Sequence, residues 1–413
     1  MRILVLSQYF PPDMGAPAGR FHDFAQQWIA RGHEVTVVTG LPHFPAGAIH
    51  PEYRRCVYRT ESVDGVTVKR CWLYSRAGRG GRPLAYATFL LSASLRVLFD
   101  RGLGYDVVVA TSPPPSVGVP GILAAWRKRV PMVLDIRDIW PEAIVQSGRL
   151  KNPLLIGLFE GTARFLYRAA DRISTVTEGW KARLVEVGVP SEKIAVLPNG
   201  VDVQAFDAQS HEALPEAFDG LEPDAHWFTY AGILNSPQGL DIVLDAFARL
   251  RDRDPEAYKS SQLVMVGEGP READLKAQQE RLGLDRVLFV PRQPRSAVFS
   301  LLRRSFAVLV TLRPRKDTST VPSKLYESLA SGRPVLFQGA GEGAETLQQA
   351  GGGAVVTPGE PDALAEAMLA YLTEPGRADA DGTRGRAFVE REFDRAAIAA
   401  RFSHLLETDR SDS

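Results

Sequence analysis

Short apolar runs alternate with helical patterns in two successive series along this chain of 413 residues, which restricts the folds it can adopt. The first series predicts strands at 3–7, 34–39, 66–71, 105–111, 132–136, 171–177 and 194–198. The second predicts strands at 227–231, 262–267, 287–291, 306–311, 334–337 and 354–356. Continuous Val, Ile and Leu runs separated by helices indicate parallel sheets covered on both faces. We therefore predict an α/β protein with two doubly wound halves.

The two halves are predicted to be separate domains with a ligand cleft between them. A polar passage rich in Pro, Gly and Ala at about 202–224 is the expected linker. The boundaries that we assign are 1–205 for the N-terminal domain and 206–389 for the C-terminal domain. Doubly wound domains bind ligands at the carboxyl ends of their strands, which is where we expect the site.

Composition excludes several classes of protein. Lys plus Arg and Asp plus Glu both number 49, so a general nucleic-acid binder, which needs clustered positive charge, is not expected. Cys56 and Cys71 are too few for a disulfide framework or a Cys-rich zinc site. No apolar run approaches the roughly 18 residues of a spanning helix, and the N-terminal run reaches Pro11 too early for a signal peptide. We expect a cytoplasmic protein, either soluble or peripheral to the membrane.

One segment of the second half is typical of a diphosphate site. Pro322 suits a helix start, where free backbone amides attract anions, and Lys324 adds a compact positive charge. Glu327 follows Ser323 by four residues, about one helical turn, so a ribose attached to the diphosphate would lie within its reach. The alternative is a capped surface helix that packs through Leu325 and its neighbours.

Further motifs follow in a fixed order, at 9–15, 197–202, 230–233, 266–269 and 321–335. Together they resemble the large family of retaining glycosyltransferases with the GT-B fold, family 4, and the resemblance covers nearly the whole chain. More narrowly, 135–142 and 321–324 resemble the bacterial polysaccharide transferases, which include fucosamine and colanic-acid transferases. The resemblance implies two Rossmann-like domains facing a central cleft, with a C-terminal helix, at 390–413, that returns to the N-terminal domain.

The resemblance also implies that the C-terminal domain holds a nucleoside-diphosphate sugar, most often linked to UDP. The donor-binding residues that it implies are Gly15, Gly232, Gly267, Arg292, Ser323, Lys324, Leu325 and Glu327. Glu327 would accept hydrogen bonds from the ribose, and the segment from Ser323 to Leu325 would supply amides and charge to the pyrophosphate. Gly15 would face the donor from the N-terminal domain.

Three positions depart from the pattern of the wider family. Ser319 stands where many members carry a first glutamate, so recognition of the sugar stays open. Gln238 replaces the lysine of a Lys-Gly pair, and Arg137 replaces the histidine of a His-Asp pair. The polysaccharide subgroup shares such changes, so they do not imply a loss of activity. Because these positions differ, catalytic roles are not transferred from the wider family.

The leaving nucleoside diphosphate needs positive partners, for which Lys324, helix-start amides and Arg313 or Arg315 are candidates. No His and carboxylate spacing indicates a metal site, so we expect metal-independent chemistry without a cofactor. Asp138 and Glu142 are the candidates for acceptor binding or base catalysis, and with Lys324 they form the predicted catalytic set.

Two alternatives stay open on the acceptor side. Asp135, Arg137 and Asp138 could instead form a structural cluster of ion pairs. His43 could also face the cleft, although a single loop histidine is more often incidental.

Two apolar stretches with basic edges, at 82–99 and 152–168, either cover the sheet or lie in a membrane interface. The subgroup implies a lipid-linked acceptor at the inner face of the plasma membrane, where these stretches would dock.

We therefore expect an enzyme that transfers a sugar, with retention, from a UDP-linked N-acetyl-hexosamine or deoxyhexosamine. The acceptor would be a lipid-linked or saccharide intermediate of a bacterial surface polysaccharide or O-antigen. Two alternatives are a hydrolysing UDP-sugar 2-epimerase, which shares the architecture, and a non-catalytic nucleotide-sugar-binding protein.

Overall fold

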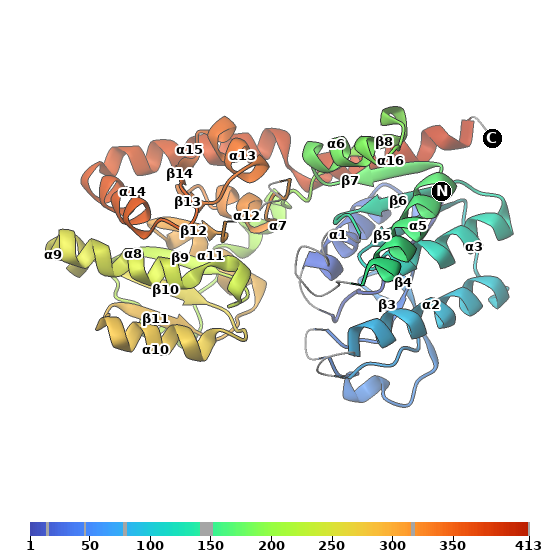
Figure 1. The fold of residues 1–413 in the computed structure, drawn as a ribbon, viewed down its shortest axis with the longest axis horizontal. Helices are drawn as coiled ribbons and strands as arrows, with labels where there is room; N and C mark the ends of the chain where they lie inside the picture. Colours follow the sequence, from blue (N-terminus) through green and yellow to red (C-terminus); the bar gives the residue numbers. More distant parts are fainter. Residues whose placement is uncertain (14–15, 45–46, 77–80, 141–151, 315–318, 412–413) are drawn as a thin grey trace. The chain divides into compact units, whose positions relative to one another are not determined.

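The chain folds into two compact units, each of which has helices on both faces of one sheet (Figure 1). The structure is a computed structural model that describes residues 1–13, 16–44, 47–76, 81–140, 152–314 and 319–411. Unit 1 consists of Met1–Pro198 with Arg395–Ser413, and unit 2 consists of Asn199–Asp394. The predicted α/β class with two Rossmann-like units is confirmed.

Unit 1 contains an eight-stranded sheet in the order β3-β4-β2-β1-β5-β6-β7-β8. Its strands are parallel except for β3, which pairs antiparallel with β4. The strands are β1 (Arg2–Leu6), β2 (Glu34–Gly40), β3 (Tyr58–Val63), β4 (Val66–Cys71), β5 (Val107–Ser112), β6 (Met132–Ile136), β7 (Arg172–Thr175) and β8 (Ile194–Val196).

Both faces of this sheet are buried, as the continuous apolar runs predict. Ile3 and Val5 of β1 belong to one core, while Leu4 and Leu6 belong to the other, because successive side chains of a strand point to opposite faces. The covering helices are α1 (Ala16–Ala30), α2 (Gly81–Phe99), α3 (Gly118–Lys128), α5 (Pro153–Ala169), α6 (Glu178–Glu186) and α16 (Arg395–Ser411).

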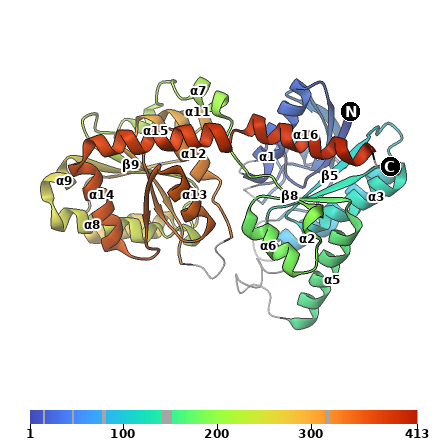
Figure 2. The same cartoon turned by 90° about the horizontal axis from the view of Figure 1, so that it is seen from above.

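The last helix, α16, packs beside α1 on one face of the unit 1 sheet (Figure 2). Phe402 of α16 makes edge contacts with Trp28 and Phe24, at ring-centroid distances of 5.3 and 5.5 Å. The end of the chain therefore completes the core of unit 1.

Unit 2 contains a six-stranded parallel sheet in the order β11-β10-β9-β12-β13-β14. The strands are β9 (His226–Ala231), β10 (Ser261–Val266), β11 (Val287–Val290), β12 (Ala307–Thr311), β13 (Val335–Gln338) and β14 (Gly353–Val356). The helices are α7 (Val203–Gln209), α8 (Leu240–Arg253), α9 (Pro255–Lys259), α10 (Glu272–Leu282), α11 (Arg295–Arg304), α12 (Lys324–Ala330), α13 (Glu342–Ala350), α14 (Pro361–Thr373) and α15 (Pro375–Glu392).

The passage expected to be a linker is part of unit 2. Asp202 caps α7 by accepting a hydrogen bond from the Ala205 amide at 2.8 Å, and Phe206 is fully buried against Phe299. The polar composition of this passage therefore predicted a linker where the structure has a short capped helix with one buried aromatic side chain.

The domain boundaries also differ from the expected ones. The divisions expected at 205/206 and 389/390 fall inside α7 and α15, whereas the units divide at 198/199 and 394/395. Near these divisions two distant segments of unit 2 run side by side, since the Val201 amide donates to Phe393 O at 3.0 Å and Val201 forms a bridge with Asp394.

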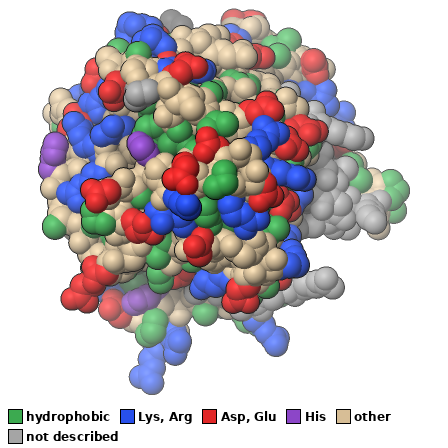
Figure 3. Space-filling model, turned by 90° about the vertical axis from the view of Figure 1, so that its left-hand side faces the viewer, with side chains coloured by type: hydrophobic (Ala, Val, Ile, Leu, Met, Phe, Trp, Pro, Cys, Tyr) green, Lys and Arg blue, Asp and Glu red, His purple; other side chains and the backbone are tan. Residues whose placement is uncertain are grey.

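The surface in Figure 3 carries interspersed Lys or Arg and Asp or Glu side chains, without a large region of one sign. Such a distribution agrees with the zero formal net charge of the chain. Within the described ranges, no helix has the length and apolar character needed to span a membrane.

Candidate functional site

In unit 2, two glycine turns pack backbone against backbone at the carboxyl ends of β9 and β10. Gly232 donates to Val266 O at 2.9 Å, and Gly267 donates to Val290 O at 3.0 Å. A Cβ atom at Gly267, whose φ is 144°, would lie only 1.9 Å from Gly232 O. The need for glycine at position 267 therefore comes from the neighbouring backbone, and the expected ligand contact there stays a prediction.

Helix α12 begins beside these turns because its apolar residues anchor it on the sheet. Leu325 and Leu329 are fully buried and pack in one cluster with Val310 of β12 and Phe337 of β13. Gly332, with φ of 70°, lies just after the helix, and β13 begins at Val335, one residue after the predicted start of this strand.

This anchoring places the Lys324 ammonium among neutral groups. Its Nζ lies 2.9 Å from Tyr230 Oη, 2.9 Å from Gln238 Oε1 and 4.2 Å from the centre of the Tyr230 ring. No carboxylate of the described chain lies within 4.0 Å of it. A Cβ atom at Gly232 would lie 2.6 Å from Nζ, so glycine at that position keeps the ammonium approachable.

The protein also holds the two partners of Lys324 in place. Gln238 ends a 3-10 turn, Ser236–Gln238, and its carbonyl accepts a hydrogen bond from Thr311 Oγ1 at 2.7 Å. Tyr230 is fully buried on β9 and donates to Ile233 O at 3.0 Å. Because Tyr230 Oη donates there, its lone pairs remain for the Lys324 ammonium.

The electrostatics of this group are unusual for a lysine. Burial lowers the pKa of Lys324 to about 7, and the Glu327 carboxylate opposes this shift. Burial also raises the pKa of Tyr230, so Tyr230 stays a neutral phenol. A nearby anion would stabilise the charged form of Lys324.

The first turn of α12 supplies fewer amides than expected. The Leu325 amide donates to Pro322 O at 2.9 Å, and the Tyr326 amide donates to Ser323 O at 3.3 Å. The expected amide from Leu325 is therefore already used within the turn. Among described residues, the Ser323 and Lys324 amides have no acceptor, and they remain the amide candidates.

Glu327 has a partner that the sequence did not indicate. Its carboxylate accepts from Arg295 Nη2 at 3.1 Å, and both side chains keep partial exposure. Arg292 is exposed, with no ion-pair partner in the described part of the chain. Arg313, a candidate cation, pairs instead with Asp241 and donates to Ser236 O at 3.0 Å.

In unit 1, Asp135 is a structural residue. It is fully buried at the end of β6 and accepts from Thr111 Oγ1 and Ser174 Oγ at 2.9 Å each and from Arg20 Nη2 at 3.2 Å. The Arg137 guanidinium lies 3.8 Å from the same carboxylate. This supports the structural-cluster interpretation for Asp135 and Arg137.

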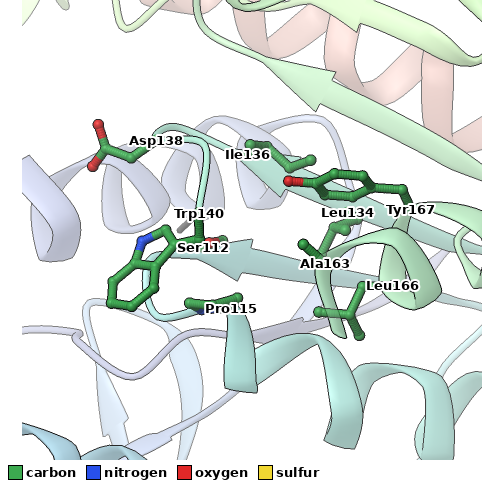
Figure 4. Close-up of a pocket in the computed structure, with 9 residues that line it drawn as sticks. All are labelled: Ser112, Pro115, Leu134, Ile136, Asp138, Trp140, Ala163, Leu166 and Tyr167. Carbon is green, nitrogen blue, oxygen red and sulfur yellow. The ribbon is translucent and has the colours of Figure 1, made fainter. Parts of the chain in front are cut away.

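Asp138 lies just beyond, beside a mainly apolar pocket (Figure 4). The other lining residues are Ser112, Pro115, Leu134, Ile136, Trp140, Ala163, Leu166 and Tyr167. In Figure 4 the Asp138 carboxylate points away from these apolar side chains. Its predicted role at the acceptor stays a prediction.

Two family models match consecutive parts of the chain. A glycosyl transferase 4-like domain matches residues 15–200, and a domain of the glycosyl transferases group 1 matches residues 225–374. The first match falls on unit 1 except for its last residues, and the second falls within unit 2. The chain belongs to the GT-B glycosyltransferases.

Among the relatives of this glycosyltransferase is the putative colanic acid biosynthesis glycosyl transferase WcaI of Escherichia coli, 26% identical, with 97% of this chain and 98% of WcaI covered. A solved structure of Anabaena Alr3699/HepE in complex with UDP superposes with a TM-score of 0.70 at 20% identity, covering 99% and 100% of the two chains. Sucrose-phosphate synthase from Thermosynechococcus elongatus gives 0.72 at 18% identity, with both chains covered completely.

The predicted site residues of this glycosyltransferase have different outcomes. Gly232 and Lys324 converge in unit 2, with Ser323 next to Lys324 in the chain. Gly15, Glu142 and the candidate Arg315 lie outside the described residues. Tyr230 and Arg295 were not predicted as site residues, although Tyr230 begins the 230–233 motif. Gln238 was noted only as a departure, and its place in the family's Lys-Gly pair was the available signal for it.

Proposed function

We propose that this glycosyltransferase moves a sugar from a UDP-sugar, with retention, to a lipid-linked or saccharide acceptor in bacterial surface polysaccharide assembly. A UDP-linked N-acetyl-hexosamine or deoxyhexosamine is the proposed donor. WcaI matches nearly the whole chain, and its name, which refers to colanic acid biosynthesis, supports a role in polysaccharide assembly. The UDP bound to the structurally similar HepE protein supports the nucleotide.

The observation that carries the proposal is the environment of Lys324. Its ammonium has two neutral partners and no close carboxylate among the described residues, and the shape of Gly232 leaves it approachable. A diphosphate would supply the missing negative charge and stabilise the ammonium by charge-assisted hydrogen bonds.

Lys324 would then act during the transfer itself. As the bond from the sugar to the diphosphate breaks, negative charge grows on the leaving phosphate, and a fixed ammonium stabilises that charge. The acceptor hydroxyl would pass its proton to the leaving phosphate, so the proposal needs neither a metal ion nor a separate base. Asp138 is proposed to bind the acceptor, and Glu327 the ribose.

We further propose peripheral contact with an anionic membrane surface through α2 and α5. Exposed apolar side chains on these helices are Leu84, Leu91, Leu95, Phe99, Leu154, Leu158 and Phe165. Trp140 joins the two helices, since its ring lies 6.4 Å from those of Tyr86 and Phe159. The exposed Arg164 and Arg168 add positive charge on α5.

Vesicle flotation tests this contact. The protein should float with vesicles that contain anionic lipid, and Leu158→Glu should weaken flotation severalfold because it places a charge in the apolar face. Ile233→Glu, which changes an exposed apolar residue of unit 2, is the control. Equal flotation of wild type and Leu158→Glu would contradict the contact.

The activity is tested with a panel of UDP- and GDP-sugars, in the presence and absence of a detergent-solubilised lipid extract of bacterial membranes. Release of UDP that depends on the extract is the expected result. Release of free, epimerised sugar without extract would indicate the epimerase instead. Tight UDP binding without turnover of any donor would contradict the proposed transfer.

A further inference from the structure

Unit 1 contains a second group of buried polar side chains, which the donor site does not use. Gln8 and Asp13 follow β1, and His43 follows β2, with exposed fractions of 1%, 4% and 8%. All three therefore lie past the carboxyl ends of parallel strands, where α/β domains bind their ligands.

Asp13 fixes the position of the segment that carries His43. Its Oδ1 accepts hydrogen bonds from the backbone amides of His43 and Phe44, each at 2.7 Å. Its Oδ2 lies 3.9 Å from His43 Nδ1 and has no hydrogen-bond partner within the described chain. Burial raises the pKa of Asp13, while His43, the two amides and Arg70 oppose this shift.

The hydrogen bond of His43 decides which ring nitrogen is available. Nδ1 lies 2.9 Å from Leu41 O, and a carbonyl oxygen only accepts, so Nδ1 carries the proton. In the neutral ring Nε2 therefore presents a lone pair. In the described ranges Nε2 contacts no donor of the protein. Tyr9 stacks on the ring at 5.4 Å between centroids and fixes its plane.

The side chain of Gln8 adds a hydrogen-bond acceptor and a hydrogen-bond donor that are also unused. Its side-chain oxygen and nitrogen are both buried, and neither has a hydrogen-bond partner among the described residues. The backbone of Gln8 lies beside β2, because its carbonyl accepts from the Gly40 amide at 3.2 Å. Buried polar groups without partners destabilise a fold, so their retention points to a ligand that completes them.

We propose that His43 Nε2 accepts a hydrogen bond from a hydroxyl group of the acceptor saccharide, with Asp13 as a positioning residue. A sugar hydroxyl can donate a hydrogen bond, which matches the lone pair of His43 Nε2. This inference rests on the proposed transferase function and names the group in unit 1 that recognises the acceptor.

Two substitutions distinguish the roles of the two ring nitrogens of His43. His43→Gln retains a polar group near the position of Nε2, whereas His43→Asn retains one near Nδ1, where it can still donate to Leu41 O. His50→Ala removes an exposed histidine of the same segment and is the matched control. Each variant is assayed for UDP affinity, for UDP release without acceptor and for transfer to the solubilised lipid extract.

His43→Asn should raise the acceptor KM by about tenfold, the size expected for losing one hydrogen bond to a substrate. His43→Gln should restore much of that loss, and UDP affinity should stay unchanged in both variants. An unchanged acceptor KM in His43→Asn, or a higher acceptor KM in His43→Gln than in His43→Asn, would overturn the inference. If the wild type binds UDP but the extract gives no transfer, the proposed function fails, and this inference fails with it.

Discussion

Unit 1 and unit 2 each contain a charged side chain packed among other groups, but the two charges have different partners. Asp135 in unit 1 is surrounded by two hydroxyl donors and the Arg20 guanidinium, so its charge is compensated within the protein. Lys324 in unit 2 has only the neutral Tyr230 and Gln238 as direct partners in the described chain.

This difference is the basis on which we propose a structural role for Asp135 and a functional role for Lys324. A compensated ion pair in a core needs nothing further, and its removal exposes the partner charge to an apolar environment. A lysine held among neutral groups is destabilised in its charged form, and a bound anion relieves that penalty. The same comparison favours Lys324 over Arg313 as the cation for a diphosphate, because Arg313 already pairs with Asp241.

The largest effect is expected from Asp135→Ala. Arg20 would be left without its counter-charge, and it also donates to Leu197 O and Pro198 O at the end of unit 1. Removing one partner of such a pair lowers the free energy of unfolding by about 3–5 kcal/mol. Urea unfolding measures the loss, and a change below about 1 kcal/mol would break the proposed contrast between the two regions.

A smaller effect, on UDP binding and not on stability, is expected when pH varies. The pKa of Lys324 is about 7 in the free protein, and a bound diphosphate should raise it because the charged form then gains a partner. At pH 8 the binding of UDP should therefore take up a proton, and affinity should fall up to about tenfold for each pH unit above 7.

Calorimetry in two buffers of different ionisation enthalpy measures this proton uptake. Lys324→Met should abolish the part that depends on the lysine, leaving only protons taken up by UDP itself. Equal uptake in the wild type and in Lys324→Met would show that another group titrates.

The sequence predicted the two sheets well because buried parallel strands consist of continuous apolar runs. It missed β3, whose residues alternate with charged ones and are mostly exposed, as in many edge strands. It also treated the segment of α7 as a linker, since the signal there was one capping Asp202 and one buried Phe206.

The candidate site was only partly predictable for a similar reason. Lys324 and Glu327 share one short helix, so their spacing already suggested a common site. Tyr230, Gln238 and Arg295 come from other elements, and only the fold brings them to that helix. The use of the Leu325 amide inside the first turn depends on local backbone geometry, which residue types alone do not specify.

Lys324 is the proposed cation that holds the donor diphosphate. A titration of UDP into Lys324→Met, at pH 7 and with Lys276→Met as the control, tests it most directly. Lys276 lies on α10 of the same unit and pairs with Glu272 at 2.8 Å on the surface. We predict that Lys324→Met weakens UDP binding by about 10- to 100-fold, the range of a charge-assisted hydrogen bond, while Lys276→Met leaves it unchanged. Equal UDP affinity in the wild type and in Lys324→Met would contradict the account.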